Sequence, residues 1–184
     1  ESLRVDDVSF PRYTTASVHN DVCLLRLRQS PRCEVPTYAR IVAHPVIPPT
    51  AIVSGWGIGS KSDNNRHILH EASVDVKDTT FCQERWANAF DASSMLCSDG
   101  DADPCSGDSG GPLFTRIGNS VELIGITSFG AEECNHSYYP TVYTRTSYCS
   151  QWVDTFIHVR QSIVCVCLNA CTSDSVDGKW CYVT

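Results

Sequence analysis

The sequence DPCSGDSGGPL, residues 103–113, decides the expected fold and points to the chemistry of the site. A serine hydroxyl is a poor nucleophile until it is exposed beside a base, so the setting of Ser109 within this run is informative. Glycines on both sides of Ser109 allow a tight turn and let backbone N–H groups point at an oxygen that becomes negatively charged during reaction. A simple turn between two strands is the structural alternative. A glycine-rich run held between a cysteine and an apolar strand rarely arises by chance, so the catalytic interpretation is favoured.

This run resembles the nucleophile loop of the trypsin-like serine proteases, which have the chymotrypsin fold. The resemblance implies that Ser109 is the nucleophile and that the N–H groups of Gly107 and Ser109 form the oxyanion hole. It also implies that the Asp108 carboxylate pairs with the new N-terminus after a zymogen is cleaved.

Other segments resemble further motifs of this family, in the family's order, over about residues 5–160. The run NDVCLL at residues 20–25 resembles the N-D-I-A-L-L strand, which gives Asp21 the role of the carboxylate that orients the catalytic histidine. The other matching segments are FPRY at 10–13, SGWG at 54–57, SFG at 128–130, PTVYTR at 140–145 and the tryptophan at 152.

The same resemblance implies which residues bind substrate. Asp103 stands where trypsin-like enzymes place the carboxylate that pairs with a substrate Arg or Lys, and a guanidinium is a good bidentate partner for it. Gly130 leaves one pocket wall open, whereas Thr141 replaces the usual glycine and is expected to narrow the pocket or mask Asp103. These features conflict, and basic P1 residues are favoured slightly over small ones. The backbone of Ser128, Phe129 and Gly130 is expected to pair with substrate.

The base histidine of the family is missing from this chain. It normally lies upstream of the aspartate in an A-A-H-C element, and none of the six histidines here has that context: they stand at 19, 44, 67, 70, 136 and 158. Because Ser109 is not activated without a base, the chain alone is expected to be inactive. Three explanations stay open: a fragment of a longer protease, which is favoured; one chain of a cleaved enzyme whose other half is attached through Cys33; or a non-catalytic homologue that binds or regulates a partner.

Eleven cysteines, without C-x-x-C pairs, are typical of disulfides and indicate a secreted, extracellular protein. The family resemblance implies two bridges, Cys82 with Cys97 and Cys105 with Cys134. Cys23 and Cys149 have no usual counterpart, and we expect them to bridge the Asp21 strand to the last helix.

Composition excludes several other functions. The net charge of −7 argues against nucleic acid binding, which needs a basic surface. No stretch approaches the roughly 20 apolar residues that span a bilayer, and the histidines and cysteines lack zinc-finger spacing. We therefore expect no cofactor or metal and no contact with a membrane. The expected partner is a polypeptide substrate or a protein inhibitor.

Short apolar runs separated by Gly, Pro, Asn and Asp predict an all-β protein. With the resemblance, this implies a chymotrypsin-like double β-barrel in which the second barrel is complete, the first is partial, and a helix follows. Residues 1–40 are interpreted as the remnant of the first barrel and the linker, 41–160 as the second barrel and terminal helix, and 161–184 as a cysteine-rich tail. Helices are predicted at residues 78–90 and 147–164. Strands are predicted at residues 22–27, 51–56, 72–76, 112–116, 121–128 and 141–144.

Overall fold

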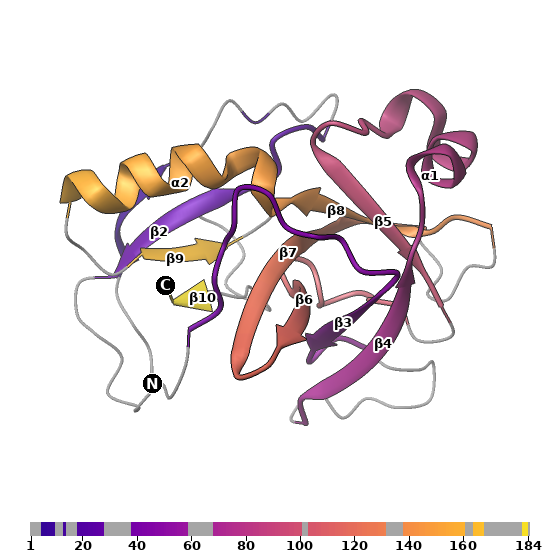
Figure 1. Cartoon of the computed structure of the whole chain (residues 1–184), viewed down its shortest axis with the longest axis horizontal. Helices are drawn as coiled ribbons and strands as arrows, with labels where there is room; N and C mark the ends of the chain where they lie inside the picture. The colour runs from indigo at the N-terminus through magenta and orange to yellow at the C-terminus, as the bar shows by residue number, and fades with distance from the viewer. Residues whose placement is uncertain are drawn as a thin grey trace.

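A computed structural model describes residues 5–9, 13, 18–27, 38–58, 68–100, 103–131, 138–160, 164–167 and 182–183. These residues form one closed barrel, a smaller sheet beside it and two α-helices (Figure 1). Among them, no helix is long and apolar enough to cross a membrane.

The barrel has six antiparallel strands in the order β3-β4-β5-β8-β7-β6, and pairing of β3 with β6 closes it. Alternate side chains of a strand point to opposite faces, so apolar residues at every second position fill the interior. Ala51, Val53 and Gly55 are the buried positions of β3, and Tyr143 at the centre of the core is fully buried. The strands are β3 (Thr50–Gly55), β4 (His70–Val76), β5 (Met95–Asp99), β6 (Pro112–Ile117), β7 (Ser120–Phe129) and β8 (Thr141–Arg145).

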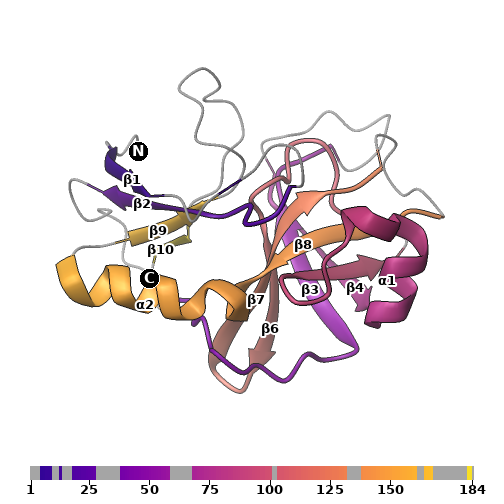
Figure 2. The same ribbon diagram turned by 90° about the horizontal axis from the view of Figure 1, so that it is seen from above.

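The smaller sheet has the order β1-β2-β9-β10, again antiparallel throughout. Its strands are β1 (Val5–Ser9), β2 (Cys23–Leu27), β9 (Val164–Cys167) and β10 (Tyr182–Val183). β9 follows the last helix and returns to pair with β2, so segments from the two ends of the chain lie side by side (Figure 2).

Helix α1 (Thr79–Trp86) begins where the sequence predicts it. The Asp78 side chain accepts a hydrogen bond of 2.9 Å from the N–H of Phe81, which satisfies one of the N–H groups left over in the first turn. A disulfide between Cys82 and Cys97 joins α1 to β5 and confirms the first predicted bridge. Cys105 is also in a disulfide, but its predicted partner Cys134 lies outside the described residues, as does Cys33.

Helix α2 (Thr146–Arg160) packs its apolar face against β2 and β7. Cys149 lies in that interface with Val22 and Leu24. Because side chains alternate along a strand, Cys23, which stands between Val22 and Leu24, belongs to the opposite face of β2. The predicted bridge between Cys23 and Cys149 is therefore wrong: no disulfide joins them.

The all-β fold class is confirmed, with one complete barrel, a second partial sheet and a C-terminal helix. The predicted strands are present with ends shifted by one or two residues. The first helix ends at Trp86 instead of 90, with a short 3-10 helix (Ala87–Ala89) after it, and the last helix ends at Arg160 instead of 164. The sequence prediction missed β1, β5 and the two tail strands. β1 reads VDDVS, with two aspartates at its centre that are disfavoured in strands, and β5 reads MLCSD, which has no β-branched or aromatic residue.

Candidate active site

Asp21 lies immediately before β2 and is almost completely buried, with an exposed fraction of 1%. The Ser128 hydroxyl donates to its carboxylate over 2.5 Å, and the Thr144 hydroxyl donates to its main-chain oxygen over 3.0 Å. Burial raises the pKa of Tyr13, and the charge of Asp21 raises it further. The Ser128 hydroxyl therefore fixes the direction of this buried carboxylate.

Backbone hydrogen bonds join the loop that contains Ser109 to β7, the strand that contains Ser128. The N–H of Gly110 donates to the oxygen of Thr127 over 2.9 Å, and the N–H of Thr127 donates to the oxygen of Gly111 over 2.9 Å. Ser109 and Ser128 are the sequence neighbours of these residues. The fold therefore brings Asp21, through Ser128, into the same region as Ser109, although the two are 88 positions apart (109 − 21).

The peptide between Ser106 and Gly107 is held by β3 and the residues that follow it. The oxygen of Ser106 accepts a hydrogen bond of 3.1 Å from the N–H of Ile58. In a trans peptide the N–H points away from the carbonyl, so the N–H of Gly107 faces the opposite side. Gly107 has a φ of 101°, which favours glycine, and an added Cβ would lie 3.2 Å from the Cα of Gly57. Within the described residues, the N–H groups of Gly107 and Ser109 donate no hydrogen bond.

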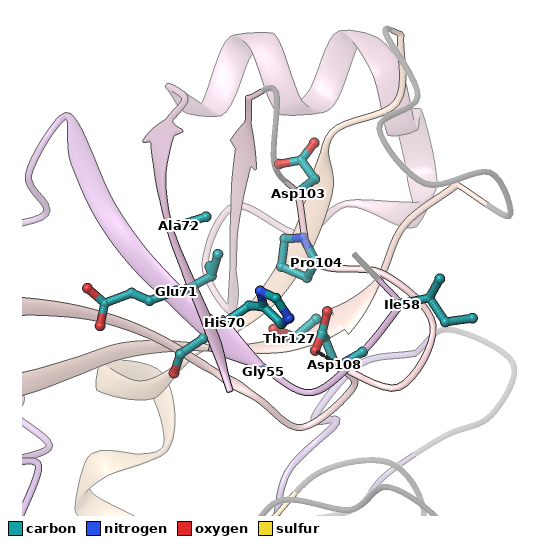
Figure 3. A pocket seen from close by; sticks show the side chains of 12 residues that line it. Gly55, Ile58, His70, Glu71, Ala72, Asp103, Pro104, Asp108 and Thr127 are labelled. Atoms are coloured by element: carbon teal, nitrogen blue, oxygen red, sulfur yellow. Dashed lines mark hydrogen bonds between the residues drawn. The ribbon is translucent and has the colours of Figure 1, made fainter. Parts of the chain in front are cut away.

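The Asp108 carboxylate points toward the end of β3. It accepts hydrogen bonds from the N–H of Gly57 over 2.7 Å and from the N–H of Cys105 over 3.0 Å. A Cβ on Gly55 or Gly57 would overlap this carboxylate, which explains the two glycines of the SGWG run. Beside it is a pocket of about 210 Å³, and Figure 3 shows its lining, which includes His70, Glu71, Asp103, Pro104 and Thr127.

Asp103 is half-buried near the entrance to the nucleophile loop. Burial and then the nearby Asp99 raise the pKa of Asp103 to about 7, while the N–H of Gly100 and the charge of Lys77 lower it. This shift is that of a carboxylate removed from water, and a cation placed beside it would restore its charge.

The predicted walls of the primary pocket, Gly130 and Thr141, face each other. A Cβ added to Gly130 would lie 3.6 Å from the Oγ1 of Thr141, which is itself 5% exposed. Trp86 connects the same two walls, because its indole N–H donates to the oxygen of Pro140 over 2.9 Å and its ring packs edge-on against Phe129 at 5.0 Å. The threonine side chain therefore occupies space that a glycine would leave open.

No described histidine forms a hydrogen bond with Ser109. Burial raises the pKa of the Asp91 carboxyl, but its hydrogen bonds with Ser93 and Ser94, and then the charge of His19, lower it below its ordinary value. His44 is exposed in the segment before β3, and His70 lines the Asp108 pocket. His67 and His136 lie outside the described residues.

Sequence reasoning missed several contacts of the site. It assigned Ser128 to substrate binding through its backbone and did not foresee that its hydroxyl holds Asp21. It gave Trp86 and His70 no role, since a helical tryptophan and a strand histidine carry no motif. Ser128 alone had a usable signal, because it begins the SFG run.

The described residues thus place a buried aspartate held by a serine near a second serine on a glycine-rich turn, an arrangement similar to part of a serine-hydrolase site. The family model for trypsin matches residues 1–153, and the chain belongs to the trypsin family of serine proteases. It is 33% identical over 144 residues to Trypsin-1 of Astacus astacus, an alignment that covers 73% of this chain and 58% of that protein. The chain thus spans less than two thirds of the length of this relative, and its barrel and partial sheet are those of a chymotrypsin-like fold.

Proposed function

We propose that this chain is the substrate-binding and nucleophile region of a secreted trypsin-like serine endopeptidase. The observation that carries the proposal is the hydrogen bond from Ser128 to the buried Asp21. Burying a carboxylate is costly for a fold, so its fixed orientation is better explained by a role in the site than by packing. Membership of the trypsin family supports the same reaction class. The cysteine content supports secretion, as do the disulfides at Cys82, Cys97 and Cys105.

In the proposed reaction, the Ser109 Oγ attacks the scissile carbonyl carbon and forms a tetrahedral oxyanion. The N–H groups of Gly107 and Ser109 stabilise that oxygen, and collapse of the intermediate leaves an acyl group on Ser109. A histidine from outside these 184 residues takes the serine proton and passes it to the leaving amine, while Asp21 orients its ring. Water then attacks the acyl group by the same route and regenerates Ser109.

Asp108 is proposed to receive the ammonium of a polypeptide N-terminus formed by cleavage of a precursor. Its carboxylate is held by two N–H groups and borders a pocket large enough for an inserted chain end. Insertion of a cation there would fix residues 105–108 and, with them, the N–H groups of the oxyanion hole. An upstream chain attached through Cys33 is one proposed source of that end.

Basic P1 residues are the proposed preference, because a cation would pair with the half-buried Asp103. Thr141 opposes this preference by narrowing the pocket across from Gly130, which favours small P1 residues. The partner is a polypeptide substrate or a protein inhibitor in either case.

A non-catalytic homologue that binds or regulates another protein is the alternative, and the lack of an A-A-H-C histidine in this chain favours it. Two measurements distinguish the proposals. The intact mass of the natural protein is measured before and after disulfide reduction. The protein is then treated with a fluorophosphonate, which modifies only an activated serine. If the protein is a protease, its mass should exceed that of this chain, and the reagent should label Ser109 but not the S109A variant. A mass of 20.3 kDa in both states without labelling would reject it in favour of the binding role.

A further inference from the structure

His70 opens β4 at the rim of the barrel. Positions 70, 72 and 74 share one face of this strand, and Val74 on that face is buried, whereas His70, at the end of the strand, is exposed. It lines the pocket beside Asp108, and Figure 3 shows its imidazole directed to the side of the pocket where Pro104 and Asp108 lie.

The strand register places His70 close to the Asp108 carboxylate. His70 is paired directly with Gly55 across the β3–β4 ladder. Side chains of such a pair lie on one face with their Cβ atoms about 5 Å apart. An added Cβ on Gly55 would coincide with the Asp108 carboxylate, so this carboxylate fills the position of the side chain that would face His70. Within the described residues no hydrogen bond or ion pair joins His70 to Asp108, so the two groups come into contact only when the imidazole turns toward the carboxylate.

The other charged groups in or near the pocket do not take the place of His70 opposite Asp108. Glu71 forms two hydrogen bonds, of 2.7 and 3.1 Å, with Arg116, and Figure 3 shows it directed away from Asp108. Asp103 lines the pocket at a different point and is the second carboxylate that a cation in the pocket would meet. Lys77 acts on Asp103 but does not line the pocket.

We propose that His70 makes the Asp108 pocket sensitive to pH: its imidazolium competes with an N-terminal ammonium for the Asp108 carboxylate, and its neutral form leaves the pocket open. This inference rests on the proposed pairing of Asp108 with a chain end. Imidazoles change charge between about pH 5 and 8, so a precursor cleaved in an acidic compartment would complete its activation only on reaching neutral pH.

The test uses the dipeptide Ile-Val as the ammonium probe, with its affinity for the whole chain measured by NMR titration at about pH 7.5 and pH 5.5. We expect the affinity of the unchanged protein to fall about fivefold to tenfold at the lower pH, and that of H70Q to fall less than twofold. H44Q, at an exposed histidine away from the pocket, should behave like the unchanged protein. Both comparisons are repeated on a D103N background, so that titration of Asp103 contributes nothing.

H70K supplies a permanent cation and should bind the dipeptide weakly at both pH values, which gives an independent test if H70Q does not fold. Equal pH dependence in the unchanged protein and H70Q, or strong binding to H70K, would overturn the role of His70 while leaving the Asp108 pairing intact. Absence of dipeptide binding to any variant at either pH would instead overturn the pairing itself, and the inference with it.

Discussion

Replacing Asp103 by asparagine tests the electrostatics of the primary pocket. Burial is the largest cause of the raised pKa of this carboxyl, and the charge of Asp99 adds to it. Asparagine keeps the shape of the side chain but carries no charge, so D103N separates the effect of charge from that of packing.

The direction of the effect follows from proton binding in the two states. In the unfolded chain the carboxyl loses its proton near the ordinary value of 3.8, and in the folded protein near 7. Between these values the folded protein binds more protons than the unfolded chain, so its stability falls as the pH rises from about 4 to about 7 and is constant above. D103N lacks this contribution at every pH.

The size of the effect follows from the same shift. A rise from 3.8 to about 7 corresponds to about 4 kcal/mol at 1.36 kcal/mol per pH unit if water did not screen the charge. Because Asp103 is partly exposed, screening reduces this to about 1–2 kcal/mol. We therefore expect D103N to be more stable than the unchanged protein by about 1–2 kcal/mol near pH 8, and about equally stable near pH 4.

The assay is urea unfolding followed by tryptophan fluorescence at several pH values, with D154N on the exposed face of α2 as the control. Benzamidine, a cationic ligand, gives a second readout on the same proteins. If it binds only the ionised form of Asp103, its affinity should fall about tenfold between pH 8 and pH 6. Identical pH dependence of stability in D103N and the unchanged protein would refute the argument.

Three further predictions concern contacts around the site. W86F keeps the ring but removes the indole N–H that reaches the start of β8, so it should lose about 1 kcal/mol of stability in urea and weaken benzamidine binding; unchanged binding would contradict its place between the pocket walls. The double variant C82A/C97A opens a loop with a sequence separation of 15 and should lose about 3 kcal/mol in the same assay, whereas a loss below about 1 kcal/mol would show that β5 does not depend on the bridge. R116A breaks an exposed pair with Glu71 and should cost less than about 1 kcal/mol at physiological salt; a larger, salt-independent loss would contradict this.

Several parts of the site could be predicted from sequence because they depend on neighbouring residues. The turn at Ser109 needs glycines within two positions of it, and the cap at Asp78 involves the N–H of Phe81 three residues later. The Cys82–Cys97 bridge came from the family resemblance, and the structure confirms it. Such features depend on local backbone geometry or on a motif, so the printed sequence contains the signal.

Where the sequence prediction failed, the missing information was the face of a strand or its register. Cys23 and Cys149 were expected to bond, yet they lie on opposite sides of β2 because only Val22 and Leu24 face α2. Residues 164–167 were assigned to the end of the last helix and to a cysteine-rich tail without a predicted fold, yet they form β9, which pairs with β2. Backbone pairing of this kind depends on which sheet edge is free in the folded protein. The sequence of a short segment therefore does not predict its partner strand.

The sequence by itself thus determined the fold class, the nucleophile turn, the helix cap and the trypsin-like motifs, because each depends on residue types at short, fixed spacing. Only the tertiary structure decided that Ser128 holds Asp21 across a separation of 107 residues. It also decided that His70 lies opposite Gly55 in the β3–β4 pair. The Asp108 carboxylate occupies the space that a side chain on Gly55 would fill. Contacts of this second kind arise from barrel closure and strand register, which bring together residues with no relation along the chain.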